Sequence, residues 1–337
     1  MDFDLRKKYR WLATASVIAV LGGCSNLVVN PPSHSDNVAD FERAWSITDS
    51  LYPYFQFKHI NWDSIHTVYA PRARDAQGDQ IFQVLYDMLG ELKDGHAEVY
   101  TEGGFPIPTY IPPRMNRDRG TFDPLVVRRY FNEELNLAGD NNMDYGILAG
   151  NIGYVRISTF DSGNWIYDFD GILKYMSNTK GLIIDVRDNG GGSSNQGDYV
   201  VSRLITSPLS YAPAYFMGKL LTGPPIQPGG HYPYHKPVVV LMNGACFSAA
   251  EDFLNEAGQV PTVTLVGDTS AGASGYPYNF TLPSGRRIRV STHDYRRYDG
   301  MPIEWNGIIP DVLVTQTPAD LESSHDLQLE RAIELLR

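Results

Sequence analysis

The stretch "PVVVLMNGACFSAAEDF", Pro237 to Phe253, decides the fold because it joins a strand-like run to a helix-like run through a short turn. Val238 to Met242 are all apolar, as in strands of a sheet that is covered on both faces. Asn243-Gly244 then breaks the strand, and Ser248 precedes the helix-like segment. Ser248 either caps this helix, as serine often does, or sits on a sharp turn that holds its hydroxyl above the sheet edge. Taken alone, the stretch favours the helix cap.

The same alternation of strand and helix extends in both directions from this stretch. "IGYVRIS" and "GLIIDV" are strand-like with a helical segment between them, and "PTVTLVG" is strand-like downstream. Such alternation predicts an α/β domain, which we assign to residues 151–337. A hairpin, a closing strand and a terminal amphipathic helix are expected near its end. Residues 101–150 are rich in Pro, Gly and Asn, and predict a connecting region of loops and short strands.

The chain upstream of this region predicts a small helical domain over residues 38–100. One helix has an apolar face with Phe41, Trp45 and Leu51, and Asp36 or Asn37 is its expected cap. A second amphipathic helix runs through "DQIFQVLYDMLGELKDGH", Asp79 to His96, where apolar residues recur at three- and four-residue spacings. The helical domain therefore ends near Gly95-His96.

The composition restricts the class of protein. The chain has 337 residues and a formal net charge of −11, which argues against a nucleic-acid binder. No His, Cys or Asp cluster in the sequence has the spacing of a metal site, so neither a metal nor another cofactor is expected.

The N-terminus predicts export. "RKKYR" is a basic segment, "WLATASVIAVL" is an apolar run too short to span a bilayer, and "LGGC" ends at Cys24. This succession resembles a bacterial lipobox, which implies a signal peptide over residues 1–23, a lipid anchor on Cys24 and a tether over residues 24–37. Ser25 favours the outer membrane over the inner membrane. The alternative is a plain signal peptide or an N-terminal helix with a chance cysteine.

A glycine turn, "DNGGG" from Asp188 to Gly192, follows the strand-like "GLIIDV". Consecutive glycines free backbone N–H groups to face a ligand. A phosphate loop, an oxyanion hole and a plain tight turn all fit this pattern, although neither phosphate-binding glycine motif is present.

Five motifs in order resemble peptidase family S41, which includes C-terminal processing and tricorn-core proteases. They are "LGELKDGHAEVY", "LIIDVRDNGGG", "VVVLMNGACFSAAEDF", "VGDTSAGASG" and "DGMPIEWNGIIPDVLV". The resemblance implies a crotonase/ClpP-like α/β core with an N-terminal helical subdomain. It also implies that Ser248 is a nucleophile, and that the N–H groups of Ala249 and of the Gly190-Gly191 turn hold the oxyanion.

The resemblance leaves the general base to be identified. The processing proteases use a lysine downstream of the serine, but no lysine follows Lys236 in this sequence. The tricorn-like branch uses a histidine oriented through a serine and a glutamate. His96 and Glu304 match that histidine and glutamate, whereas Gly95 stands in the place of the orienting serine. A histidine whose pKa is near neutrality would suit the task.

Other polar residues near these motifs have ordinary structural interpretations. Glu251 and Asp252 are expected to face solvent in the first helical turn, where they complement the helix dipole. Asp185 and Arg187 are expected to tie the glycine turn, and Cys246 to fill the core.

The sequence therefore predicts a serine peptidase without a cofactor, acting on protein or peptide substrates in the cell envelope. The alternative is a non-catalytic ligand- or peptide-binding lipoprotein on the same scaffold, because fold does not fix function. A crotonase-like acyl-CoA enzyme shares the fold class but does not explain the lipobox.

Overall fold

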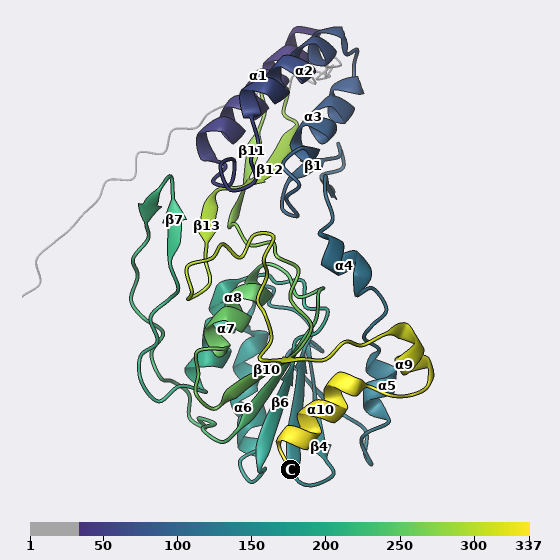
Figure 1. Ribbon diagram of the computed structural model, residues 1–337, viewed down its shortest axis with the longest axis vertical. Helices are drawn as coiled ribbons and strands as arrows, with labels where there is room; N and C mark the ends of the chain where they lie inside the picture. Colours follow the sequence, from purple (N-terminus) through teal and green to yellow (C-terminus); the bar gives the residue numbers. More distant parts are fainter. Residues whose placement is uncertain (1–33) are drawn as a thin grey trace, which may run out of the picture. The chain divides into compact units, whose positions relative to one another are not determined.

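A seven-stranded sheet forms the centre of the C-terminal part of the protein (Figure 1), in a computed structural model that describes residues 34–337. Its strand order is β14-β10-β9-β6-β5-β4-β3, with parallel pairing from β14 to β5 and antiparallel pairing beyond. The strands are β3 (Asn136–Ala138), β4 (Met143–Leu148), β5 (Ile152–Ile157), β6 (Gly181–Asp185), β9 (Val238–Met242), β10 (Val263–Gly267) and β14 (Val312–Leu313). The predicted α/β class is confirmed, and β3 and β4 extend this sheet from within residues 101–150.

Helices cover both faces of this sheet, as the continuous apolar strands predicted. Ile184 and Val240 pack in one apolar cluster, whereas their neighbours Ile183 and Val239 pack in another, because successive strand residues point to opposite faces. The first cluster includes residues of α6 (Phe169–Tyr175), α7 (Ser194–Ser202) and α8 (Ala249–Ala257). The second includes residues of α5 (Pro124–Arg128) and α10 (Leu327–Leu335).

Three N-terminal helices pack on a second sheet with the order β11-β12-β1-β2. These elements are α1 (His34–Leu51), α2 (Trp62–Asp75), α3 (Gln80–Gly90), β1 (Glu98–Tyr100), β2 (Pro106–Pro108), β11 (Pro277–Thr281) and β12 (Arg287–Ser291). The hairpin of β11 and β12 was expected from the sequence, and Ile288 and Val290 on β12 join the apolar core of the three helices. The N-terminal helices are therefore bound to a segment nearly 200 residues downstream, in one compact unit from Pro32 to Arg337.

The start of α1 differs from the prediction. The helix begins at His34, so neither Asp36 nor Asn37 occupies the cap position. Asn37 is instead fully buried and donates hydrogen bonds to the carbonyl oxygens of Ala76 and Gly78, which fastens α1 to the end of α2. The predicted signal peptide and Cys24 lie outside the described residues.

The remaining elements are short. They are η1 (Asn164–Asp168), α4 (Pro113–Arg117), α9 (Pro318–Glu322), and a sheet of β13 (His293–Tyr295), β7 (Ala214–Phe216) and β8 (Lys219–Leu220). Across residues 34–337, the structure contains no helix with the length and apolar character needed to cross a membrane.

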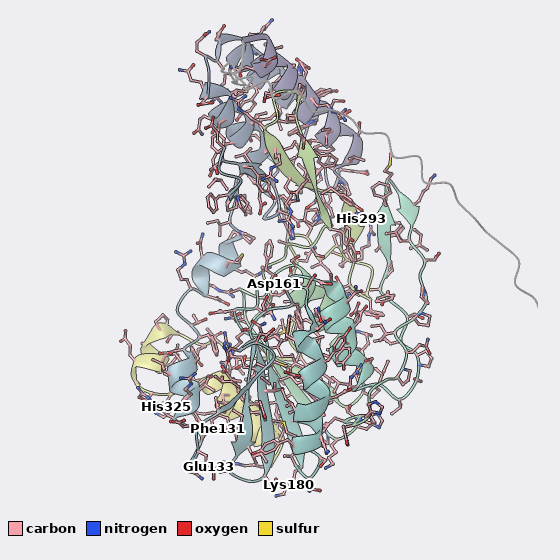
Figure 2. The ribbon with its side chains drawn as sticks, turned by 180° about the vertical axis from the view of Figure 1, so that it is seen from behind. Phe131, Glu133, Asp161, Lys180, His293 and His325 are labelled. Carbon is pink, nitrogen blue, oxygen red and sulfur yellow. The ribbon has the colours of Figure 1, made fainter. Side chains whose placement is uncertain are left out.

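The two ends of the parallel strands differ in what they carry. Figure 2 shows Lys180, just before β6, at one end of the core, and Asp161, in the loop after β5, toward the other end. Beyond the carboxyl end of β6, the fully buried Arg187 donates to Asp185 at 2.6 Å and to Asp326 at 2.8 Å. Arg187 thus ties the end of β6 to the start of α10, whereas it was expected to tie the glycine turn. The carboxyl ends of β6 and β9 carry the glycine turn and Ser248.

Candidate active site

Ser248 occupies the position before α8 but does not cap it. Its side chain makes no cap hydrogen bond, and its backbone lies at φ 58° and ψ −126°. Few residues other than glycine adopt this region, at a cost of roughly 1–3 kcal/mol. The helix-cap interpretation of Ser248 is therefore wrong, and the structure contains the sharp strand-to-helix turn instead.

The glycine turn and the Ser248 turn are bound to each other side by side. Asn243 donates its side-chain amide to Asp188 at 2.8 Å and accepts the Asp188 backbone N–H at 3.1 Å. The N–H of Phe247 donates to the carbonyl of Asn189 at 3.1 Å. These bonds fix the ends of β6 and β9 together, so the two motifs quoted from the sequence form one site.

The structure distinguishes the three predicted oxyanion donors. The Gly191 N–H donates to the side chain of Asn189 at 2.9 Å, so it is already engaged. Ala249 is the first residue of α8, where backbone N–H groups have no partner within the helix. Gly190 has open space around its Cα. Gly190 and Ala249 therefore remain the candidate oxyanion donors, whereas Gly191 packs against the Ser248 turn.

Glu251 corrects a prediction, because it is fully buried rather than solvent-facing. Its carboxylate accepts hydrogen bonds from the Ser270 hydroxyl at 2.6 Å and from the N–H groups of Gly272 and Ala273 at 2.8 Å each. The carbonyl of Ala273 in turn accepts the N–H of Ser248 at 3.1 Å. Burial raises the pKa of Glu251 to about 7, and its three hydrogen bonds oppose this shift.

Asp252, also expected to face solvent, lies with Ser248 in the lining of a cavity of about 350 Å³. It accepts hydrogen bonds from the hydroxyls of Ser194 at 2.8 Å and Ser274 at 3.2 Å. Burial raises its pKa to about 6, against the effect of these two hydroxyls. Arg289 of β12 reaches the same cavity.

His96 is buried, with 2% of its surface exposed, and neither ring nitrogen has a hydrogen-bond partner. Burial lowers its pKa to about 4, below the near-neutral value expected of a base, although Asp94 opposes the shift. The ring packs on Phe247, the residue before Ser248, with 4.4 Å between ring centroids. His96 therefore lies next to the Ser248 turn without a hydrogen bond to Ser248.

Phe247 also explains why no serine stands at position 95. A Cβ atom on Gly95 would lie 2.8 Å from Cε2 of Phe247 and 3.0 Å from Cγ of Pro112. A side chain at this position would displace Phe247, so the packing against the Ser248 turn favours glycine at position 95.

Glu304 is fully buried and pairs with a residue that the sequence did not single out. Its Oε1 lies 2.5 Å from Nζ of Lys58, whose side chain is also fully buried. Lys58 donates further to the carbonyls of Leu92 at 3.0 Å and Lys93 at 3.1 Å, in the turn that leads to His96. Burial and Asp94 raise the pKa of Glu304, whereas Lys58 lowers it. Glu304 thus acts on the His96 turn through Lys58, and no hydrogen bond joins it to His96.

The structure brings Ser248, Gly190, Gly191 and Ala249 together, and places His96 against the adjacent Phe247. Sequence reasoning did not single out Lys58 or Phe247, because their partners Glu304 and His96 are distant in the chain. It named Glu251 but expected that residue to face solvent. Within the described residues, no group of three or more His, Cys, Asp or Glu side chains is arranged to hold a metal ion.

Comparison with known proteins places the chain among peptidases. A model of peptidase family S41 matches residues 151–314, and a model of the tricorn protease C1 domain matches residues 34–90. A solved structure from Parabacteroides merdae, described as a candidate peptidase, is 30% identical with a TM-score of 0.77, covering 90% of this chain and 96% of that chain. These matches confirm the predicted resemblance and fold class.

Two curated relatives represent the two branches that the sequence resembles. The carboxyl-terminal-processing protease of Synechocystis is 28% identical over 190 residues, which cover 55% of this chain and 44% of the relative. The tricorn protease of Thermoplasma volcanium is 25% identical over 267 residues, which cover 77% of this chain and 24% of the relative. The chain spans less than half the length of the first curated relatives that it matches.

The glycine turn yields a paired prediction. At Gly191, φ is 89° and a Cβ atom would lie 2.5 Å from the carbonyl oxygen of Phe247, whereas Gly190 has open space. We expect Gly191→Ala to cost roughly 1–3 kcal/mol in the free energy of unfolding, and Gly190→Ala to cost much less. Urea denaturation measures both values. Equal stability of the two variants would contradict the packing role of Gly191.

The buried His96 yields a prediction for acid stability. Because its pKa is about 4 in the folded protein and about 6.5 when exposed, the unfolded chain takes up a proton first as the pH falls. The free energy of unfolding should therefore fall by on the order of 3 kcal/mol between pH 6.5 and pH 4 on account of His96 alone. His96→Gln should lose this component in urea denaturation series, and the exposed His235→Gln should keep it. Parallel pH curves for wild type and His96→Gln would mean that His96 is not held neutral by burial.

Proposed function

Because the chain belongs to peptidase family S41, we propose that it is a serine peptidase that hydrolyses peptide bonds of protein or peptide substrates in the cell envelope through an acyl-enzyme on Ser248. The observation that carries the proposal is the backbone of Ser248, which is held at φ 58° at the edge of the sheet without capping α8. A strained turn of this kind presents a hydroxyl to a substrate.

The chemistry follows from the groups around Ser248. The Oγ of Ser248 attacks the scissile carbonyl carbon while its proton passes to a base, and the carbonyl oxygen becomes an oxyanion. The N–H groups of Gly190 and Ala249 stabilise that charge. The intermediate then collapses, the C–N bond breaks, and the leaving amine takes the proton from the base. Water releases the acyl group in the second half of the reaction.

His96 is the proposed base. Both of its ring nitrogens lack a hydrogen-bond partner, so one of them is available to take a proton. Its ring packs against Phe247, the residue before Ser248, with 4.4 Å between ring centroids, which places the imidazole beside the Ser248 turn. In this proposal Glu304 is a positioning residue, which holds the turn before His96 through Lys58.

The second candidate function is non-catalytic binding of a ligand or peptide on the same scaffold. The specific observation in its favour is that His96 has no hydrogen bond to Ser248 and is buried. The strained serine and the free donors at Gly190 and Ala249 favour the peptidase, because neither feature is needed for binding alone.

The proposal extends to location. The succession of basic, apolar and small residues before Cys24 supports a lipid anchor on that cysteine, with the outer membrane favoured by Ser25. Metabolic labelling with an alkyne fatty acid tests the anchor, because Cys24→Ser should remove the label and release the protein from membranes. Label that persists in Cys24→Ser would refute the anchor.

A fluorophosphonate probe tests the activity directly, because the Oγ of an activated serine displaces fluoride from the probe and forms a stable phosphonyl ester. We expect stoichiometric labelling of wild type, on the peptide that contains Ser248, as measured by mass spectrometry of the digested protein. Ser248→Ala should take up no label, and the exposed-site control Ser207→Ala should label as wild type does. Folded wild-type protein that takes up no label would favour the binding function.

A further inference from the structure

A second cavity, of about 320 Å³, adjoins the Ser248 cavity and is bordered by three acidic side chains. The two cavities share five lining residues, which are Ser194, Asn195, Asp252, Tyr276 and Tyr295. The acidic residues are Asp198 on α7 and Asp252 and Glu256 on α8. We call this space the acidic cavity.

The carboxylates of the acidic cavity are incompletely satisfied. Glu256 is 7% exposed, and its Oε2 has no hydrogen-bond partner. Asp198 accepts a hydrogen bond from Tyr211 at 2.7 Å on one oxygen, while the other oxygen has no partner. Burial raises the pKa of Glu256 well above its usual range, and Asp198 and Asp252 add to this effect. A buried carboxylate without a partner is costly, so this cavity favours a positively charged or hydrogen-donating ligand.

The nearby cations are engaged elsewhere. Arg296, which also lines the acidic cavity, donates to Asp294 at 2.6 and 2.9 Å. Arg289, which lines the Ser248 cavity, lies 3.4 Å from Glu98. These arginines therefore do not pair with the three carboxyl groups of the acidic cavity, and a cation that enters the cavity would favour the ionised form of Glu256 over the protonated form that burial favours.

The geometry favours an organic cation over a metal ion. Within residues 34–337, no three carboxylates or imidazoles are close enough to coordinate one ion. The walls also include the rings of Tyr211, Tyr276 and Tyr295. Aromatic rings attract ammonium and guanidinium groups, and they cover the apolar stem of a long side chain.

The acidic residues extend along α8 away from Ser248. Asp252 and Glu256 follow Ser248 by four and eight residues, which corresponds to about 6 and 12 Å along a helix. An extended peptide advances about 3.3 Å per residue. A cation in the acidic cavity would therefore come from a residue within about four positions of the bond that Ser248 attacks.

We propose that the acidic cavity binds the cationic side chain of a lysine or arginine in the peptide substrate, near the scissile bond. This inference rests on the proposed peptidase function and deepens it by naming a substrate class. Glu256 and Asp198 supply the charge, and Asp252 connects the acidic cavity to Ser248.

The test uses N-acetylated, C-amidated peptides of otherwise neutral sequence, in which one lysine is moved through the four positions on each side of the cleaved bond. Each lysine peptide is paired with a norleucine peptide of the same length, so only the charge differs. At one position kcat/KM should be about ten- to a hundredfold higher for lysine, the range of a charged hydrogen bond. Arginine should share the preference, and acetylation excludes a contribution from the peptide amino terminus.

Two variants assign the preference to the acidic cavity. Glu256→Gln and Asp198→Asn should each bring the lysine-to-norleucine ratio toward one, while Glu334→Gln, an exposed carboxylate on α10, should keep the wild-type ratio. Urea denaturation establishes that the variants are folded. Turnover without a lysine preference at any position, or a preference that survives both variants, would overturn the subsite.

A measurement of peptide affinity distinguishes failure of the proposed subsite from failure of the proposed peptidase function. Fluorescence anisotropy measures the affinity of fluorescein-labelled lysine and norleucine peptides for Ser248→Ala protein. Tighter binding of lysine peptides that is lost on adding Glu256→Gln would support the subsite even if no peptide is cleaved. Equal binding of both peptides, with no turnover, would overturn the subsite.

Discussion

The site depends on the hydrogen bonds that the buried carboxylate of Glu251 accepts. It accepts three hydrogen bonds from Ser270, Gly272 and Ala273, and so fixes the loop whose last carbonyl holds the N–H of Ser248. The hydroxyl of Ser270 also accepts the N–H of Ile308 at 2.7 Å. One buried carboxyl group thereby joins the Ser248 turn to the loop that precedes β14. Removing an acceptor from three donors leaves buried groups unpaired, which costs about 1–3 kcal/mol for each group.

The same loop connects Ser248, the proposed nucleophile, to the N-terminal helices. The carbonyl of Gly272 accepts the N–H of Trp305 at 2.8 Å, next to Glu304. Glu304 then pairs with Lys58, which holds the turn before His96. The predicted base and the predicted nucleophile come from segments 152 residues apart in the sequence. This series of buried contacts links the two segments. Strain at Ser248 persists because the surrounding bonds over-determine it.

The sequence predicted the strands and helices that show apolar periodicity, and the turns that carry a recognisable motif. Continuous apolar runs such as Val238 to Met242 predicted strands with both faces covered, and the two core clusters bear this out. The helix that begins at Gln80 followed from its apolar spacing, but it ends at Gly90, whereas the prediction carried it on to His96. The glycine turn and the Ser248 turn were quoted as separate motifs, and their adjacency follows from parallel strands that end at one sheet edge.

The sequence could not predict contacts between distant segments. Glu251 was expected to face solvent because an acid in a first helical turn is ordinary, and only the loop from Ser270 to Ala273 turns it into a buried acceptor. The pairing of Lys58 with Glu304 spans 246 residues and carries no local signal. Phe247 on His96, and the acidic cavity between α7 and α8, likewise arise from tertiary packing alone.

The rate at which a fluorophosphonate probe labels Glu251→Gln tests the central claim most directly. Glutamine keeps the volume of Glu251, but it places an amide donor where the carboxylate accepts from backbone N–H groups. If Glu251 holds Ser248 in its strained conformation, the folded variant should label at least about tenfold more slowly than wild type, equivalent to about 1.4 kcal/mol. The exposed Glu322→Gln should label at the wild-type rate. A folded Glu251→Gln protein that labels as fast as wild type would contradict the account.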